Sequence, residues 1–132
     1  MGTGGTISGI INTAATSQKV LGFPALKGDF LTEEIQKLVH ASNWELEQRY
    51  HFGGYAKVPE TLVRFMNEFK NTHQIVLDPI YTGKMMYGIL DLISKDFFPQ
   101  NSRILAIHTG GLQGIEGVNK KLQKKGSQTI DI

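Results

Sequence analysis

Apolar side chains recur at helical spacing in five stretches of the chain. The first stretch repeats at three- and four-residue intervals, which is typical of one buried helix face. A good N-cap residue, a proline or a glycine precedes each later stretch, and these residue types often begin helices. The predicted helices begin after the glycines at 2–5, at Thr32, at Pro59, after Gly83 and at about Gly114, the last ending at Lys125.

Short apolar runs between the helices predict strands at Lys19–Phe23, Ile75–Leu77 and Ile104–Ile107. The run at 104–107 is continuously apolar, so we expect it to be covered on both faces. The stretch from Asn43 to Val58 is aromatic and irregular, with no predicted element. Strands that alternate with helices indicate an α/β fold with a mostly parallel sheet and flanking helices.

Composition narrows the possible functions. Hydrophobic residues make up 40% of the 132 residues and charged residues 20%, which is enough to form a core and excludes disorder. The 14 Lys and Arg nearly balance the 12 Asp and Glu, so neither nucleic acid nor a membrane is an expected partner. There is no cysteine, and the four histidines lack metal-ligand spacing, so we predict no metal site. No stretch has the length of a membrane span or the form of a signal peptide, and we expect a cytoplasmic protein.

Three glycine-containing loops are candidate ligand loops: Gly2–Thr6, Tyr81–Gly83 and Thr109–Gly111. In open α/β sheets, such loops gather at the carboxyl ends of the strands. The first loop suits a phosphate, because its N–H groups and the helix N-terminus favour an anion. It does not match G-x-G-x-x-G, since Ile7 stands where glycine is required. From its residues alone, the loop is either structural or phosphate-binding. Tyr81 is likewise either a core-edge packing residue or a functional one.

The start of the chain suggests a larger parent protein. A glycine loop of this kind normally follows a strand, and no strand precedes Gly2. We therefore expect residues 1–132 to be a single partial domain, with Met1 an added or substituted start.

Four motifs in order carry a family resemblance. They are Gly2–Thr6 opening a helix, Gly54-Tyr55, Leu77–Lys84 with the sequence Leu-Asp-Pro-Ile-Tyr-Thr-Gly-Lys, and Ile107–Gly111. In this order the chain, from Gly2 to about Val118, resembles the C-terminal part of the pyridoxal-phosphate enzymes of the 1-aminocyclopropane-1-carboxylate deaminase and D-cysteine desulfhydrase family. These enzymes share the fold of the tryptophan synthase β subunit, so the resemblance implies the C-terminal part of the large domain of a fold-type II enzyme.

The resemblance also implies a site. It gives Tyr55 and Tyr81 as the two active-site tyrosines, beside pyridoxal 5'-phosphate and a small amino-acid substrate. A phenol there would have a lowered pKa if it lay close to a cationic cofactor. The implied cofactor-binding residues are Thr3, Gly4, Gly5 and Thr6 around the phosphate (loop 2–6), with Thr82 of the tyrosine motif 78–84 and Thr109 of the motif 108–111 near the pyridine nitrogen.

Two departures from the family pattern refine this expectation. Thr82 stands where the deaminases proper have glutamate, and His108-Thr109 also resembles the desulfhydrase side of the family. The lysine that binds the cofactor covalently lies before the phosphate loop in this family, and we do not assign that role to Lys84. The resemblance therefore implies a fragment, inactive alone, of a homodimeric enzyme that forms a 2-oxo acid and ammonia. The alternative is a non-catalytic α/β module that binds a phosphorylated metabolite or a nucleotide at its glycine loop.

Overall fold

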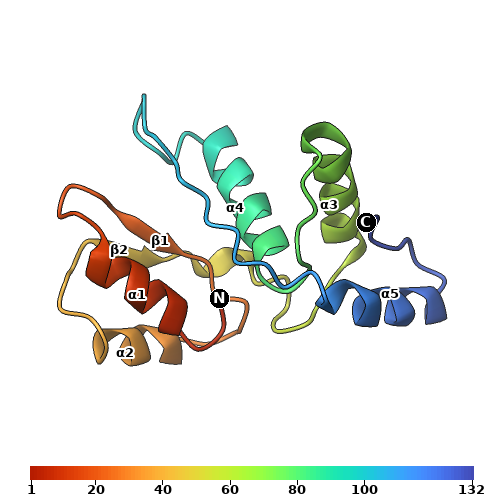
Figure 1. The fold of residues 1–132 in the computed structure, drawn as a ribbon, viewed down its shortest axis with the longest axis horizontal. Coiled ribbons are helices and arrows are strands. Elements are labelled where there is room, and N and C mark those ends of the chain that lie inside the picture. Colours follow the sequence, from red (N-terminus) through yellow and green to blue (C-terminus); the bar gives the residue numbers. More distant parts are fainter.

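The computed structural model describes all 132 residues and contains a short parallel sheet with flanking helices (Figure 1). The elements in chain order are α1 (Gly5–Thr13), β1 (Val20–Gly22), α2 (Phe30–Gln36), β2 (Trp44–Leu46), the 3₁₀ helix η1 (Gln48–Tyr50), α3 (Glu60–His73), α4 (Thr82–Ser94) and α5 (Gly114–Lys124). The helices are too short to cross a bilayer as apolar spans.

The first half of the chain packs around the sheet. Strands β1 and β2 pair in parallel, with Val20 opposite Trp44 and Gly22 opposite Leu46. Helices α1 and α2 lie together beside this sheet (Figure 1). Their contact is a buried aliphatic cluster, because each helix turns its apolar stripe toward the other. The cluster consists of Ile7, Ile11, Ile35 and Val39.

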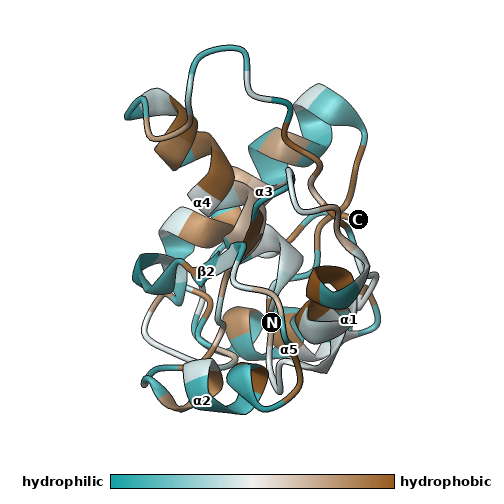
Figure 2. Cartoon of the chain, turned by 90° about the vertical axis from the view of Figure 1, so that its left-hand side faces the viewer, coloured by the Kyte–Doolittle hydropathy of each residue, from teal (hydrophilic) through white to brown (hydrophobic).

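The second half is helical, and α4 joins it to the first. One buried cluster links α3, α5 and the C-terminal segment, and its members include Leu62, Met66 and Ile115. A second cluster sets Ile89 and Leu92 of α4 against residues of the first half, Phe23 and Tyr50. Figure 2 shows the corresponding hydropathy, with long apolar stretches on α4 and a largely hydrophilic α2.

The helix predictions are confirmed with small corrections at their starts. Helix α2 begins at Phe30, after Asp29, so the expectation that Thr32 is its N-cap is wrong. Pro59 precedes the first helical residue of α3 rather than occupying it, and α4 starts at Thr82. Strand β2 lies in the stretch expected to be irregular, because its three residues are strand only through their pairing with β1.

Two predicted strands are wrong in this chain. Residues 75–77 and 103–108 make no backbone hydrogen bonds to other backbone groups, so neither segment belongs to a sheet. The run at 104–107 is also not covered on both faces, since Leu105 is 86% exposed and Ile104 and Ile107 are each 41% exposed. An apolar run becomes a strand only where a neighbouring strand accepts its N–H groups, and this chain offers none.

Candidate functional site

One cavity collects residues from all three glycine loops. It has a volume of about 1140 Å³ and lies between the N-terminal loop, β1, the start of α4 and the extended segment after it. Apolar residues of the segment 104–107 form part of its wall. The predicted site residues on its lining are Thr3, Gly4, Gly5, Thr6, Tyr81, Thr82 and Thr109. Tyr55 is not on the lining.

The N-terminal loop presents free backbone donors. Gly4 has φ 87°, a left-handed conformation that favours glycine, and α1 starts at the next residue. The first N–H group of this region with a backbone acceptor is that of Ser8, which donates to Gly4 O at 3.0 Å. The N–H groups of residues 5–7 have no acceptor in the chain, and no side chain caps the helix. Such converging donors, together with the helix dipole, suit an anion.

Tyr81 lies directly beside this loop. A Cβ atom built on Gly2 would be 3.2 Å from the Tyr81 hydroxyl oxygen, so any larger residue at position 2 would contact the phenol. The ring of Tyr55 is 6.3 Å from that of Tyr81 between centroids, at an interplanar angle of 53°. The structure thus brings the two predicted tyrosines together, with Tyr81 on the cavity lining and Tyr55 outside it.

The chain's own groups do not lower the pKa of the Tyr81 phenol. Burial raises this pKa, and the neighbouring Tyr55 and the carboxylate of Asp78 raise it further. Without a cation beside it, Tyr81 therefore stays protonated well above neutral pH. The lowered pKa expected from the sequence would require a positively charged group that the chain itself does not supply at this point.

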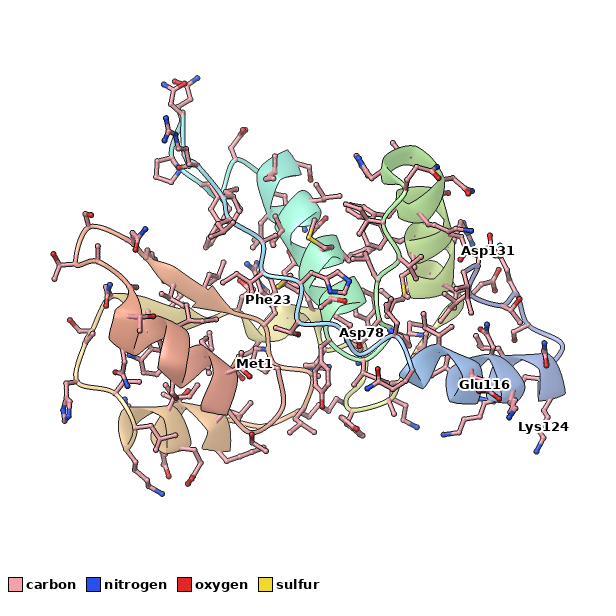
Figure 3. All side chains as sticks on the ribbon, viewed as in Figure 1. Met1, Phe23, Asp78, Glu116, Lys124 and Asp131 are labelled. Atoms are coloured by element: carbon pink, nitrogen blue, oxygen red, sulfur yellow. The ribbon has the colours of Figure 1, made fainter.

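Asp78 organises the start of α4 (Figure 3). Its carboxylate accepts hydrogen bonds from the backbone N–H groups of Ile80 and Tyr81, both at 2.9 Å. It also accepts from the N–H and the hydroxyl of Thr82, both at 2.7 Å. A Cβ on Gly111, which has φ 89°, would lie 3.3 Å from the Asp78 side chain, so the third glycine loop packs directly on this carboxylate. Asp78 belongs to the tyrosine motif 78–84, but no role was predicted for it from the sequence.

His108 connects the two extended segments. Its Nδ1 accepts from the N–H of Gly110 at 3.0 Å, which assigns the ring hydrogen to Nε2. Nε2 then donates to the carbonyl of Val76 at 2.9 Å. The neighbouring Thr109 is exposed and lies on the cavity lining. His108 therefore fixes the loop that carries Thr109 against the segment that leads to Asp78.

Lys84 lies next to the site and has a role that its sequence position did not predict. Its side chain is buried, and its ammonium donates to the carbonyls of His51 and Gly54, each at 2.9 Å. Burial lowers its pKa to about 8, against the opposing effect of the Asp78 carboxylate. A lysine in the first turn of a helix is disfavoured by the dipole, and this is the sequence feature that could have drawn attention to it.

Comparison with curated proteins gives relatives along most of the chain. A protein from Pyrococcus furiosus, named as a candidate 1-aminocyclopropane-1-carboxylate deaminase, is 32% identical over 127 residues, 86% of this chain and 38% of the relative. A protein of the same name from Pyrococcus horikoshii is 29% identical and matches 92% of this chain and 41% of its own length. A 1-aminocyclopropane-1-carboxylate deaminase from Mesorhizobium japonicum is 51% identical over 43 residues, 33% of this chain. The chain thus spans about two fifths of the length of the first two relatives.

Solved structures give the same similarity. A crystal structure of a protein described as an ACC deaminase homologue superposes with a TM-score of 0.82 at 29% identity. The match covers 94% of this chain and 42% of that protein. No protein-family model matches the chain. The fold, including its short sheet and flanking helices, is therefore that of part of the ACC deaminase homologue.

Proposed function

We propose that this chain, which is similar over most of its length to proteins named 1-aminocyclopropane-1-carboxylate deaminase, is the phosphate-binding and tyrosine-bearing part of a pyridoxal-phosphate enzyme. The proposed reaction converts a small amino acid, 1-aminocyclopropane-1-carboxylate or D-cysteine, into a 2-oxo acid and ammonia, with sulfide from D-cysteine. The observation that carries the proposal is the shared cavity of the N-terminal loop, Tyr81, Thr82 and Thr109.

The N-terminal loop fits the phosphate of this cofactor. The free N–H groups of residues 5–7 point from the start of α1, and the hydroxyls of Thr3 and Thr6 are exposed and uncommitted. The left-handed Gly4 packs closely, because a Cβ there would lie 3.0 Å from Ile35 Cγ1. These groups would bind the phosphate oxygens through backbone donors, and no cationic side chain of the loop is needed.

Thr82 fits the pyridine nitrogen as an acceptor. Pyridoxal 5'-phosphate, when bound, supplies an electron sink for negative charge at the substrate. The only hydrogen of the Thr82 hydroxyl is donated to Asp78, and one lone pair accepts from the N–H of Asp78 at 2.9 Å. The remaining lone pair can only accept, so Thr82 would favour a protonated ring nitrogen. Asp78 would then support that charge through Thr82.

Tyr81, which lies on the cavity lining, would handle protons there, with Tyr55 next to it outside the lining. Tyr81 is held by the Asp78 contact to its N–H, and its raised pKa keeps the phenol protonated at neutral pH. A protonated phenol is a general acid, and it becomes a base or nucleophile only when a nearby cation stabilises the phenolate. Tyr55 stands beside it as a second donor.

A non-catalytic phosphate-binding module is the second candidate function. The lysine of the tyrosine motif, Lys84, is hydrogen-bonded to the carbonyls of His51 and Gly54 and is not on the cavity lining. It is therefore not available to attach a cofactor covalently. The lysine that does line the cavity, Lys19, is ion-paired with Glu45. With both lysines committed in this way, we also propose that the 132-residue chain by itself is inactive.

Titration followed by amide NMR tests the proposal. We expect inorganic phosphate and pyridoxal phosphate to shift the amides of residues 2–7 saturably, and pyridoxal phosphate alone to shift Thr82, Thr109 and the Tyr81 ring as well. The variant Gly4→Ala, strained at φ 87°, should lose both responses. An adenine nucleotide that shifts Tyr81 and Thr82 more strongly than pyridoxal phosphate would favour the second candidate.

An assay for 2-oxo acid tests the proposed inactivity. The chain is incubated with pyridoxal phosphate and either 1-aminocyclopropane-1-carboxylate or D-cysteine, and no product above the protein-free control is expected. Turnover that depends on the chain and is abolished in Gly4→Ala would contradict this part of the proposal.

A further inference from the structure

Lys84 is a buried cation at an unfavourable position. It is the third residue of α4, and its side chain is only 1% exposed. The N-terminal turn of a helix carries partial positive charge, and removing an ammonium from water adds a further cost. The carboxylate of Asp78 offsets part of this cost. The reason for a lysine at this position must therefore lie in the hydrogen bonds that it makes to residues outside α4.

Those contacts converge on one tight turn. The two carbonyls that accept from Lys84 belong to His51 and Gly54, on either side of two residues with φ 55° (Phe52) and 94° (Gly53). Gly54 itself has φ 122°. This left-handed path aims both carbonyl oxygens at the same point. The turn therefore forms a receptor for a hydrogen-bond donor, and the ammonium of Lys84 supplies two donors at once.

The turn and the lysine lie next to the two tyrosines. Tyr55 directly follows Gly54, and Tyr81 lies one helical turn before Lys84. The Tyr55 ring is 54% exposed, so packing alone holds it weakly. Its neighbour across 6.3 Å is the Tyr81 ring. The Lys84 hydrogen bonds thus join the segment that carries one phenol to the segment that carries the other.

We propose that Lys84 is a positioning residue, which binds the turn at 51–54 to the start of α4 and thereby fixes the phenol of Tyr55 beside that of Tyr81. Only the joint chemical role of the two phenols rests on the proposed function. The placement itself is a property of the chain without any ligand.

The variant Lys84→Met tests this placement. Methionine is unbranched and of similar length, so it fills the buried channel, but it donates no hydrogen bond. We expect the nuclear Overhauser contacts between the Tyr55 and Tyr81 rings to disappear. The hydrogen-bonded amides of the turn, those of Gly53, Gly54 and Lys57, should exchange about tenfold faster or more. The amides of α5 should keep their exchange rates. The control Lys57→Met changes an exposed lysine of the same loop whose side chain makes no hydrogen bond, and it keeps the backbone N–H that donates to Gly54 O, so neither measurement should change.

A second variant acts on the acceptor side. In Gly54→Ala the new Cβ has space, with its nearest neighbour 4.0 Å away, but φ 122° is strained for alanine, so the turn should leave its present path. We expect the same loss of ring contact, and this variant decides the question if Lys84→Met does not fold. Retention of the ring contact and of slow exchange in folded Lys84→Met, or in Gly54→Ala where that is the only folded variant, would overturn the proposal. Neither measurement needs a cofactor, so failure of pyridoxal phosphate to bind would count against the proposed function alone.

Discussion

Four hydrogen bonds end on the carboxylate of Asp78, and three of them come from successive backbone N–H groups at positions 80–82. Charged acceptors make stronger hydrogen bonds than neutral ones. This set therefore fixes the backbone of Tyr81 independently of its phenol. Removing the phenol oxygen should change chemistry at the cavity while leaving the local backbone in place.

The first prediction concerns Tyr81→Phe. The ring keeps its packing, so the free energy of unfolding should change by less than about 1 kcal/mol, as for a partly exposed hydrogen bond. In the active enzyme that we propose, turnover should fall about 10²-fold or more, as for the loss of a general acid. Chemical denaturation and steady-state kinetics on 1-aminocyclopropane-1-carboxylate and D-cysteine measure the two effects. Unchanged turnover on both substrates would make Tyr81 a packing residue.

The second prediction concerns pH and Lys84. Its pKa is about 8 in the folded chain and 10.5 when it is exposed on unfolding. Between these values the unfolded chain binds more protons, so the free energy of unfolding should rise with pH, by on the order of 1–2 kcal/mol from pH 8 to 10. Denaturation at several pH values should show this rise in the native chain and not in Lys84→Met.

Other groups limit that pH window, among them the Tyr81 phenol, whose raised pKa makes stability fall above pH 10. Burial lowers the pKa of the N-terminal amine from 8.0 to about 6. The free energy of unfolding therefore also rises as this amine loses its proton, but that rise is complete near pH 8. Burial and the hydrogen bond to Asp91 raise the pKa of Tyr50 to about 12, so stability falls as the pH rises above 10. A rise between pH 8 and 10 that persists unchanged in Lys84→Met would assign it to a group other than Lys84.

At the scale of elements, α4 is the helix that packs the two halves of the molecule against each other. Gly88, in its middle, has no room for a side chain: a Cβ would lie 2.6 Å from Phe23 Cε1 and 3.0 Å from Tyr50 Cδ2. Both aromatic residues belong to the cluster that joins α4 to the first half. The absence of a side chain at this position is therefore what allows the helix to pack directly on Phe23 and Tyr50.

The third prediction compares two helix-interior glycines. Gly88→Ala should destabilise the chain by about 1–3 kcal/mol, because the overpacking exceeds the gain in helix propensity. Gly117→Ala in α5, where nothing lies within 4 Å of the new Cβ, should stabilise it by up to about 1 kcal/mol. Thermal or denaturant unfolding measures both. Equal effects in the two variants would contradict the close approach of α4 to Phe23.

Sequence patterns predicted the helices well because helical periodicity is local. Leu62, Met66 and Ile89 stand at helical spacing and are buried, whereas Ile93, one turn after Ile89, is 46% exposed. Strands depend on partners elsewhere in the chain, and the patterns were less informative about them. Trp44–Leu46 is a strand through β1, whereas the more strongly apolar 104–107 has no partner here.

The candidate site was predicted in part. The ordered motifs identified the loops that line the cavity, since each loop carries glycine or threonine at a recognisable spacing. The roles of Asp78 and Lys84 were not predicted. Their importance comes from carbonyl, hydroxyl and N–H groups that become neighbours only in three dimensions, such as the acceptors of His51 and Gly54.

At the scale of the whole molecule, the extended segment after α4 is the most exposed apolar feature. It runs from beyond the end of α4 back past the helix toward α5 (Figure 1). Its backbone groups at 103–108 lack backbone partners, and Leu105 is 86% exposed. An unpaired apolar edge of this kind invites pairing with another chain.

The fourth prediction concerns this edge. The 132-residue chain should bind an apolar fluorescent dye and self-associate with increasing concentration, and Leu105→Lys should reduce both several-fold, because a charge on an edge blocks pairing. Sedimentation velocity and dye fluorescence measure these effects. Ile132→Lys changes an isolated residue that is 76% exposed and serves as the control. An equal reduction in the control would assign the effect to net charge rather than to the edge.

The cavity is built from opposite ends of the chain, since the loop at 2–6 and Thr109 share its lining. Bringing such distant segments together costs closure entropy before their contacts form. Helix α3 and its neighbour α4 are joined by a short connection and need no such closure. During folding, these helices should therefore form ahead of the cavity, and the anion-binding loop should acquire its shape among the final steps.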